Sequence, residues 1–189
     1  MISDERNNHS STVTGMNMRL KQLALIAGST LALATLTGRS AEAADTTVTF
    51  TVTSGALTIT AATGPVSLGS TAAGNSISGP LGTVRVTDAR GGTPTSDWTA
   101  RVSSTSFIGP SDTIAAAAAV YTPGAGTLLV GTGTLTPGAP GSLGAQRIAM
   151  TYTGGTGNSD ATWDPTLSIA VPLSVGLGTY TGTVTHSVA

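Results

Sequence analysis

The side chains that could carry out a reaction are few in this sequence. The chain has no cysteine, which excludes a thiol nucleophile and a metal site built on thiolates. After residue 43, His186 is the only histidine, so no pair of histidines can hold zinc there. A Ser–His–Asp triad would have to use His186, and no G-x-S-x-G nucleophile motif is present. The sequence therefore disfavours nucleophilic and zinc-dependent catalysis.

Two pairs of aspartates lie close in sequence, Asp88 with Asp97 and Asp160 with Asp164. A pair of carboxylates can cleave a glycosidic bond, so a glycan-active enzyme is one interpretation. All four residues lie in or beside predicted loops, where Asp side chains hydrogen-bond the backbone of turns. We therefore expect these carboxylates to stabilise turns, and we predict that the chain is not an enzyme.

The segment NSDATWD carries Asn158, Asp160 and Asp164, three oxygen ligands within seven residues. Calcium takes about six to eight oxygen ligands, and no EF-hand spacing is present. We predict turn chemistry at these positions, and neither a metal site nor a cofactor.

Four ring-bearing residues are the predicted binding residues: Trp98, Trp163, Tyr180 and His186. Each lies on the apolar face of a segment in which apolar and polar residues alternate. A tryptophan buries a large apolar surface and needs one partner for its N–H group. A core role is therefore the first interpretation of both tryptophans, and a platform on which a sugar ring stacks is the alternative.

The N-terminal region has the pattern of a secretory signal. Arg19 and Lys21 precede an apolar run over residues 23–36, which is shorter than the ~20 residues of a membrane span. The run is followed by Ala41-Glu42-Ala43, an A-x-A cleavage signature. We predict an N-terminal extension and a signal-peptide helix over residues 1–43, and a secreted domain over 44–189 without a membrane segment. Met1, Met16 and Met18 remain open as start codons.

The predicted secreted part is weakly charged. It contains no Lys and no Glu, and its four Arg stand against six Asp. Such a surface lacks the basic stripe that nucleic-acid binding requires, so no nucleic-acid partner is expected.

Apolar residues alternate with Thr or Ser along most of this part, as in Val48, Phe50 and Val52 between threonines. Period-two alternation of β-branched residues is typical of half-buried strands. The alternating ranges are 46–53, 57–60, 82–88, 98–103, 147–153, 161–172 and 178–189. Segments rich in Gly, Pro, Ser and Asn separate them and are predicted as loops: 62–70, 89–97, 122–144 and 153–160. We predict an all-β, immunoglobulin-like antiparallel β-sandwich.

Two positions leave alternatives open. The run Ile114–Val120 is compatible with a short helical turn or with a strand. Pro165 interrupts an otherwise regular strand pattern, and because proline donates no ladder hydrogen bond, this strand is predicted to lie at an edge or to be bulged.

Three segments resemble the WxL-domain surface proteins of Gram-positive bacteria. They are TFTVTSGALTITAATGPVSLGS (49–70), SDWTARVSS (96–104) and GTYTGTVTHSVA (178–189). Both signatures are altered: Ala100 stands where the first motif has Leu, and His186 and Val188 stand where the second has Trp and Leu. The resemblance implies a secreted all-β domain that attaches noncovalently to the cell wall, with peptidoglycan as its target.

We therefore predict a secreted, noncatalytic surface protein that associates noncovalently with peptidoglycan or another cell-wall polymer, outside a Gram-positive cell. Other cell-surface proteins are a further predicted class of partner. The alternative is a structural or adhesive β-domain that assembles with other surface proteins by edge-strand pairing. Ice binding through the Thr-x-Thr pattern is disfavoured, because it requires a fixed repeat that these segments lack.

Overall fold

The computed structural model of the chain describes residues 46–91 and 96–189. The predicted signal helix lies outside these residues. One compact unit runs from Thr49 to Ala189, and the predicted domain start at residue 44 stays a prediction. Within the described ranges, no helix is long and apolar enough to cross a membrane.

The described residues form short strands and one 3-10 helix, as the alternating pattern predicts. The elements are β1 (Leu57–Thr60), β2 (Ser76–Pro80), β3 (Val84–Asp88), β4 (Trp98–Ser104), β5 (Phe107–Ile108), β6 (Thr113–Ile114), η1 (Ala116–Ala118), β7 (Ala119–Thr122), β8 (Gly126–Val130), β9 (Thr134–Pro137), β10 (Gly141–Ser142), β11 (Arg147–Thr153), β12 (Ser159–Trp163), β13 (Thr166–Ala170) and β14 (Val184–Val188).

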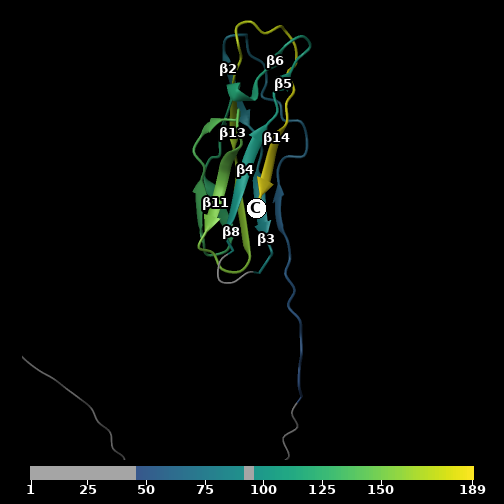
Figure 1. Cartoon of the computed structure of the whole chain (residues 1–189), viewed down its shortest axis with the longest axis vertical. Helices are drawn as coiled ribbons and strands as arrows, with labels where there is room; N and C mark the ends of the chain where they lie inside the picture. Colours follow the sequence, from purple (N-terminus) through teal and green to yellow (C-terminus); the bar gives the residue numbers. More distant parts are fainter. Residues whose placement is uncertain (1–45, 92–95) are drawn as a thin grey trace, which may run out of the picture. The chain divides into compact units, whose positions relative to one another are not determined.

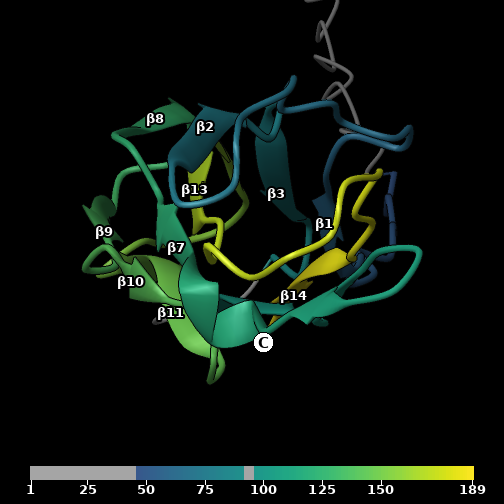
Figure 2. The same ribbon diagram turned by 90° about the horizontal axis from the view of Figure 1, so that it is seen from above.

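Two antiparallel sheets enclose the core, with strand orders β1-β3-β12-β8 and β14-β4-β11-β9. Their edges approach each other where β1 lies beside β14 and β8 beside β9. Figure 2 shows the strands arranged around a common interior. The buried residues of both sheets form one cluster, among them Val86 from β3, Trp163 from β12, Val102 from β4 and Met150 from β11. The predicted all-β antiparallel sandwich is confirmed.

A third sheet, with the order β10-β7-β13-β2, continues the first sheet toward one end of the domain. Strands β2, β13 and β7 are joined in sequence to β3, β12 and β8 by short breaks, so three long strands each bend once. Pro165 lies in one break, where its carbonyl accepts a hydrogen bond from the Leu81 N–H at 2.9 Å. The predicted interruption at Pro165 is confirmed. Its predicted edge position is wrong, since β12 and β13 have neighbours on both sides.

Residues 46–53 form no strand of the sandwich, although their alternation predicted one. The ladder between β1 and β3 starts at Leu57, which lies opposite Asp88. On the N-terminal side of Leu57, the last backbone hydrogen bond to this neighbour runs from the Gly55 N–H to the Ala89 carbonyl at 2.9 Å. The chain before Gly55 therefore runs past the end of its partner strand. Figure 1 shows residues 49–54 at the end of the sandwich away from β2, β5 and β6. Alternation gives a segment one apolar face, but a strand also needs a backbone partner.

The range 122–144 was predicted as a loop and instead contains β8, β9 and β10. Its Gly and Pro residues fall mostly between these short strands, and Pro137 ends β9. The run 114–120 combines both alternatives, because η1 connects β6 to β7.

Strand β11 contains a bulge that the alternation did not predict. Its register against β4 shifts between Ile148 and Met150, so that Ala149 and Met150 are both buried. Ile148 is turned outward as a result, although it was predicted to share a face with Met150.

We expect removal of residues 180–189 to abolish cooperative unfolding. Strand β14 pairs with β4 from Val184 opposite Ser104 to Val188 opposite Ala100, and Ala189 exchanges two backbone hydrogen bonds with Thr99. Its loss exposes one face of the core and leaves the β4 edge unpaired, and a domain of this kind has only about 5–15 kcal/mol of stability in total. Urea unfolding followed by tryptophan fluorescence tests this. A truncated chain with the midpoint of the full chain would contradict it.

Candidate functional site

An apolar cavity of about 870 Å³ lies at the β2 end of the sandwich. Strands β2 and β13 form one wall, and β5, β6 and β14 contribute to the other. The connections β1–β2 and β13–β14 close it, and Figure 2 shows both at this end. The apolar side chains of its lining are Val66, Leu68, Ile77, Leu81, Phe107, Ile114, Leu167, Ile169, Val171, Val175, Leu177 and Val184.

The chemistry of the cavity favours an uncharged, apolar occupant. Its lining contains no Asp, Glu, Lys or Arg. His186 and Tyr180 are its only residues with a ring that titrates, and the other polar groups are Ser and Thr hydroxyls and backbone. Its volume falls within the ~300–1,000 Å³ of typical ligand pockets.

His186 connects the cavity to the core through a chain of hydrogen bonds. The Trp163 Nε1–H donates to the Tyr121 hydroxyl oxygen at 3.1 Å, and this hydroxyl lies 3.0 Å from His186 Nε2. The Tyr121 and His186 rings are tilted by 58° with their centroids 5.6 Å apart. Strands β12, β7 and β14 thus each supply one member, so these hydrogen bonds connect the three four-stranded sheets.

The positions of the protons follow from this order. The Trp163 N–H can only donate, so the Tyr121 oxygen accepts it and its own hydrogen is free for His186 Nε2. We assign this donation, which requires a neutral imidazole with its proton on Nδ1. Burial lowers the pKa of His186 to about 4, in agreement with the neutral form. Burial also raises the pKa of Tyr121 to about 12, which keeps its hydroxyl protonated.

Tyr180 lines the same cavity and is half-buried. Its hydroxyl donates to the Gly176 carbonyl at 2.9 Å. Its ring lies against Gly109, where a Cβ atom would come within 2.5 Å of the ring, so only glycine fits there. Burial and the Asp112 carboxylate raise the pKa of Tyr180.

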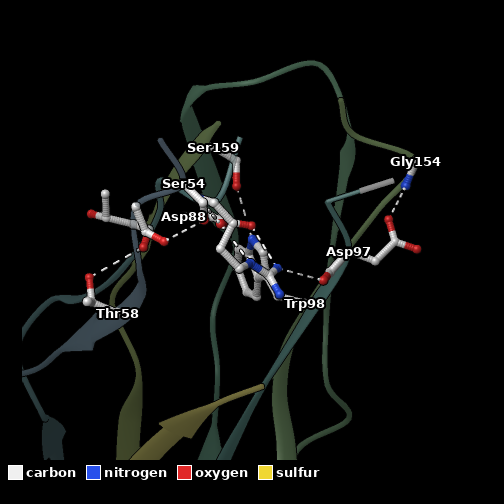
Figure 3. Close-up of polar contacts among 10 residues, drawn as sticks. Ser54, Thr58, Asp88, Asp97, Trp98, Gly154 and Ser159 are labelled. Atoms are coloured by element: carbon white, nitrogen blue, oxygen red, sulfur yellow. Dashed lines mark hydrogen bonds and ion pairs between the residues drawn. The ribbon is translucent and has the colours of Figure 1, made fainter. Parts of the chain in front are cut away.

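Trp98 is apart from the cavity, near the other end of the sandwich. Its Nε1–H donates to Ser159 Oγ at 3.1 Å (Figure 3). Its ring stacks on Tyr152 at a centroid distance of 5.6 Å. Trp98 and Trp163 are each only 2% exposed, so neither offers a free ring face to a sugar. The structure thus brings Tyr180 and His186 to one cavity, connects Trp163 to it through Tyr121, and leaves Trp98 separate.

The aspartates considered for catalysis are engaged in structural contacts. Asp88, whose side chain is fully buried, accepts two side-chain hydrogen bonds from Arg90 at 2.9 and 2.8 Å, which lower its pKa. Asp160 forms an ion pair with Arg85 that lowers its pKa in the same way.

The other two aspartates of these pairs also serve the fold. Asp97 accepts the Gly154 N–H at 2.9 Å, as Figure 3 shows, and Asp164 accepts the Thr83 hydroxyl. Within the described ranges, no three acidic or His side chains gather as a metal site. The predicted turn chemistry fits Asp88 and Asp97, which accept the backbone N–H groups of Arg90 and Gly154. It does not describe Asp160, which lies within β12 and pairs with Arg85, or Asp164, which accepts a side-chain hydroxyl.

Sequence reasoning missed Tyr121 and Phe107 as residues of this region. Tyr121 is buried and central to the hydrogen-bond chain, and Phe107 lines the cavity. Alternation in β7, where Ala119, Tyr121 and Pro123 are buried, was the available signal for Tyr121. It was obscured by the alanine run that precedes it.

The WxL resemblance places its two motifs on β4 and β14. These two strands are neighbours in one sheet. Ala100 of β4 lies opposite Val188 of β14, and Val102 lies opposite His186. The altered positions of both motifs are therefore side by side.

Comparison of the chain with protein-family models, with curated proteins and with solved structures finds no match.

We expect the free energy of unfolding to fall as the pH is lowered from about 6.5 toward 4. The pKa of His186 is lower in the folded protein than its ordinary value of 6.5. As the pH falls, His186 is therefore protonated in the unfolded chain before it is protonated in the folded protein, and this protonation favours the unfolded state. The loss amounts to as much as ~2 kcal/mol at pH 5 relative to pH 7.5. The pKa values of Asp88 and Asp160 are lowered, so protonation of these carboxylates reduces the free energy of unfolding at more acidic pH.

Urea unfolding at both pH values measures this effect, with His186→Gln as the control. The Gln amide oxygen can accept the Tyr121 hydroxyl but does not titrate. Equal pH dependence in the variant and the original chain would contradict the assignment to His186.

We expect Tyr121→Phe to destabilise the domain by ~1–3 kcal/mol, because it leaves the Trp163 N–H and His186 Nε2 without their buried partner. The control is Tyr180→Phe, which removes a single hydrogen bond at a half-buried position and should cost ~0.5–1.5 kcal/mol. Thermal unfolding compares the two variants. A smaller loss in Tyr121→Phe than in Tyr180→Phe would contradict the prediction.

Proposed function

We propose that this chain is a secreted, noncatalytic surface domain that acts by noncovalent association. The observation that carries this proposal is the apolar, uncharged cavity between β2 and β14, which suits binding rather than a reaction. The carboxylates support it as well. Asp88 and Asp160 are neutralised by Arg90 and Arg85, so neither is a free acid or base.

The first proposed partner is a cell-wall polymer, peptidoglycan above all. The resemblance to WxL domains suggests it, and the pairing of β4 with β14 supports it by placing both motif positions on adjacent strands. Because Trp98 and Trp163 are buried and the cavity favours an apolar occupant, a wall polymer would be bound by other groups, such as the exposed Thr185 and Ser187 hydroxyls of β14.

We expect the secreted protein to sediment with purified peptidoglycan and to release no soluble glycan fragments. Trp98→Phe should be retained equally, because the Trp98 ring contacts Tyr152 and Ser159 rather than solvent. The bound fraction is measured after centrifugation, and fragments are measured in the supernatant. Protein that stays in the supernatant would contradict wall association, and released fragments would contradict a noncatalytic role. Loss of binding in a folded Trp98→Phe variant would place the indole in the wall site.

The second proposed function is structural: the domain assembles with other β-domains. A specific observation favours it. Val48, Phe50 and Val52 are 80%, 85% and 83% exposed, although a strand face of this kind is normally buried. Three apolar side chains on one face of an unpaired segment are typical of a strand that is completed by a partner.

A further inference from the structure

The segment formed by residues 46–53, here called the donor segment, has the properties of a strand without a sheet. Val48, Phe50 and Val52 alternate with threonines, and their side chains are exposed to solvent. No residue of the segment belongs to a strand, and its backbone hydrogen bonds to the described sheets begin only at Gly55. It thus carries both an apolar face and unpaired backbone groups.

The cavity has the complementary properties. Ile77 of β2 and Val184 of β14 line it, and both strands are the last in their sheets. Because β14 lies beside β1, the edge that is free is the edge of β2. Of the backbone hydrogen bonds in the described ranges, none joins residues 61–71 to β2. The apolar surface continues outward to Val66 and Leu177, which are 42% and 96% exposed.

We propose that the donor segment of one copy of this chain enters the cavity of a second copy as an added β-strand. Val48, Phe50 and Val52 occupy the apolar cavity, while the backbone pairs with the free edge of β2. This is β-strand addition, in which main-chain hydrogen bonds give affinity and side-chain pockets give specificity. The inference rests on the second function proposed above, assembly between β-domains, and does not depend on wall binding.

The composition of both partners matches this pairing. The donor segment has no charged residue, and neither has the cavity lining. An apolar strand can therefore be buried there without leaving an unpaired charge. A charged polymer would find no counter-charge in the cavity.

The cavity of the same chain is poorly placed to receive the segment. Gly55 is already paired with Ala89, and β1 runs from there to Thr60, beyond which Ala61 begins the cavity lining. Six extended residues, 55–60, separate donor and cavity by roughly 20 Å.

Donor and cavity thus lie at opposite ends of β1, so each copy can give a strand at one end and receive one at the other. Such an interface is heterologous and does not close on itself unless the rotation between copies forms a ring. The expected products are chains of copies joined head to tail, whose length increases with concentration.

The first test is sedimentation velocity of the protein produced from the full coding sequence, over a range of concentrations. We expect the sedimentation coefficient to rise with concentration, and we expect Phe50→Asp to abolish this rise. Leu129→Asp is the matched control, because Leu129 of β8 is also exposed, at 54%, but lies away from both donor and cavity. A monomer at all concentrations overturns the proposal, as does assembly that survives Phe50→Asp or is lost equally in Leu129→Asp.

The second test locates the contact. The chain has no cysteine, so single cysteines can be introduced at exposed positions without competing thiols. A mixture of Phe50→Cys and Leu177→Cys chains should form a disulfide-linked heterodimer under mild oxidation. Phe50→Cys mixed with Leu129→Cys should form far less. Equal yields in the two mixtures overturn the assignment of the cavity as the receiving site.

These experiments separate the proposals. Phe50→Asp that stays monomeric and still sediments with peptidoglycan supports both strand addition and wall binding. Assembly without sedimentation leaves strand addition standing and removes wall binding. A monomer that sediments with peptidoglycan overturns strand addition and leaves the first proposed function intact.

Discussion

The fold depends on one constraint: each strand must bury one face and pair its backbone at the same time. The two four-stranded sheets satisfy it where β3, β12, β4 and β11 face one another, and their inward side chains form a single buried cluster. No disulfide supplements this packing, since the chain has no cysteine. Stability therefore rests on apolar burial and on the strand ladders.

The packing of the interior differs between the two ends of the sandwich. Near Trp98 the interior is filled by stacked rings, and the ion pair of the buried Asp88 with the partly exposed Arg90 lies at its margin. At the β2 end, the same two layers diverge around an apolar cavity, and only irregular connections cover it. The hydrogen-bond chain from Trp163 through Tyr121 to His186 lies between these regions. It satisfies the polar groups that would otherwise be buried without partners, and it holds the three sheets in one arrangement.

The packed end and the cavity end also differ in which residues hold the fold together and which are available for function. The residues first considered for chemistry, the aspartates and the two tryptophans, are engaged in ion pairs, turns and the core. Among the exposed apolar groups of the described residues are the face of residues 46–53 and the outer part of the cavity lining at Val66 and Leu177. A protein whose unused surface is apolar is suited to association, with a wall polymer or with further copies of itself.

The sequence by itself determined the fold class and about half of the strands, because alternation is a local property of the chain. Strand β2 and the strands within 122–144 went unpredicted, since their Gly and Pro content resembles that of loops. Strands β5 and β6 also went unpredicted, because a strand of two residues is too short to show an alternation. Only the tertiary structure decided that Val48, Phe50 and Val52 lie outside the sandwich, that the tryptophans are buried, and that Tyr121 meets His186. The reason is physical: alternation gives a segment an apolar face, but whether that face is covered depends on where distant partner strands end and which layer packs opposite.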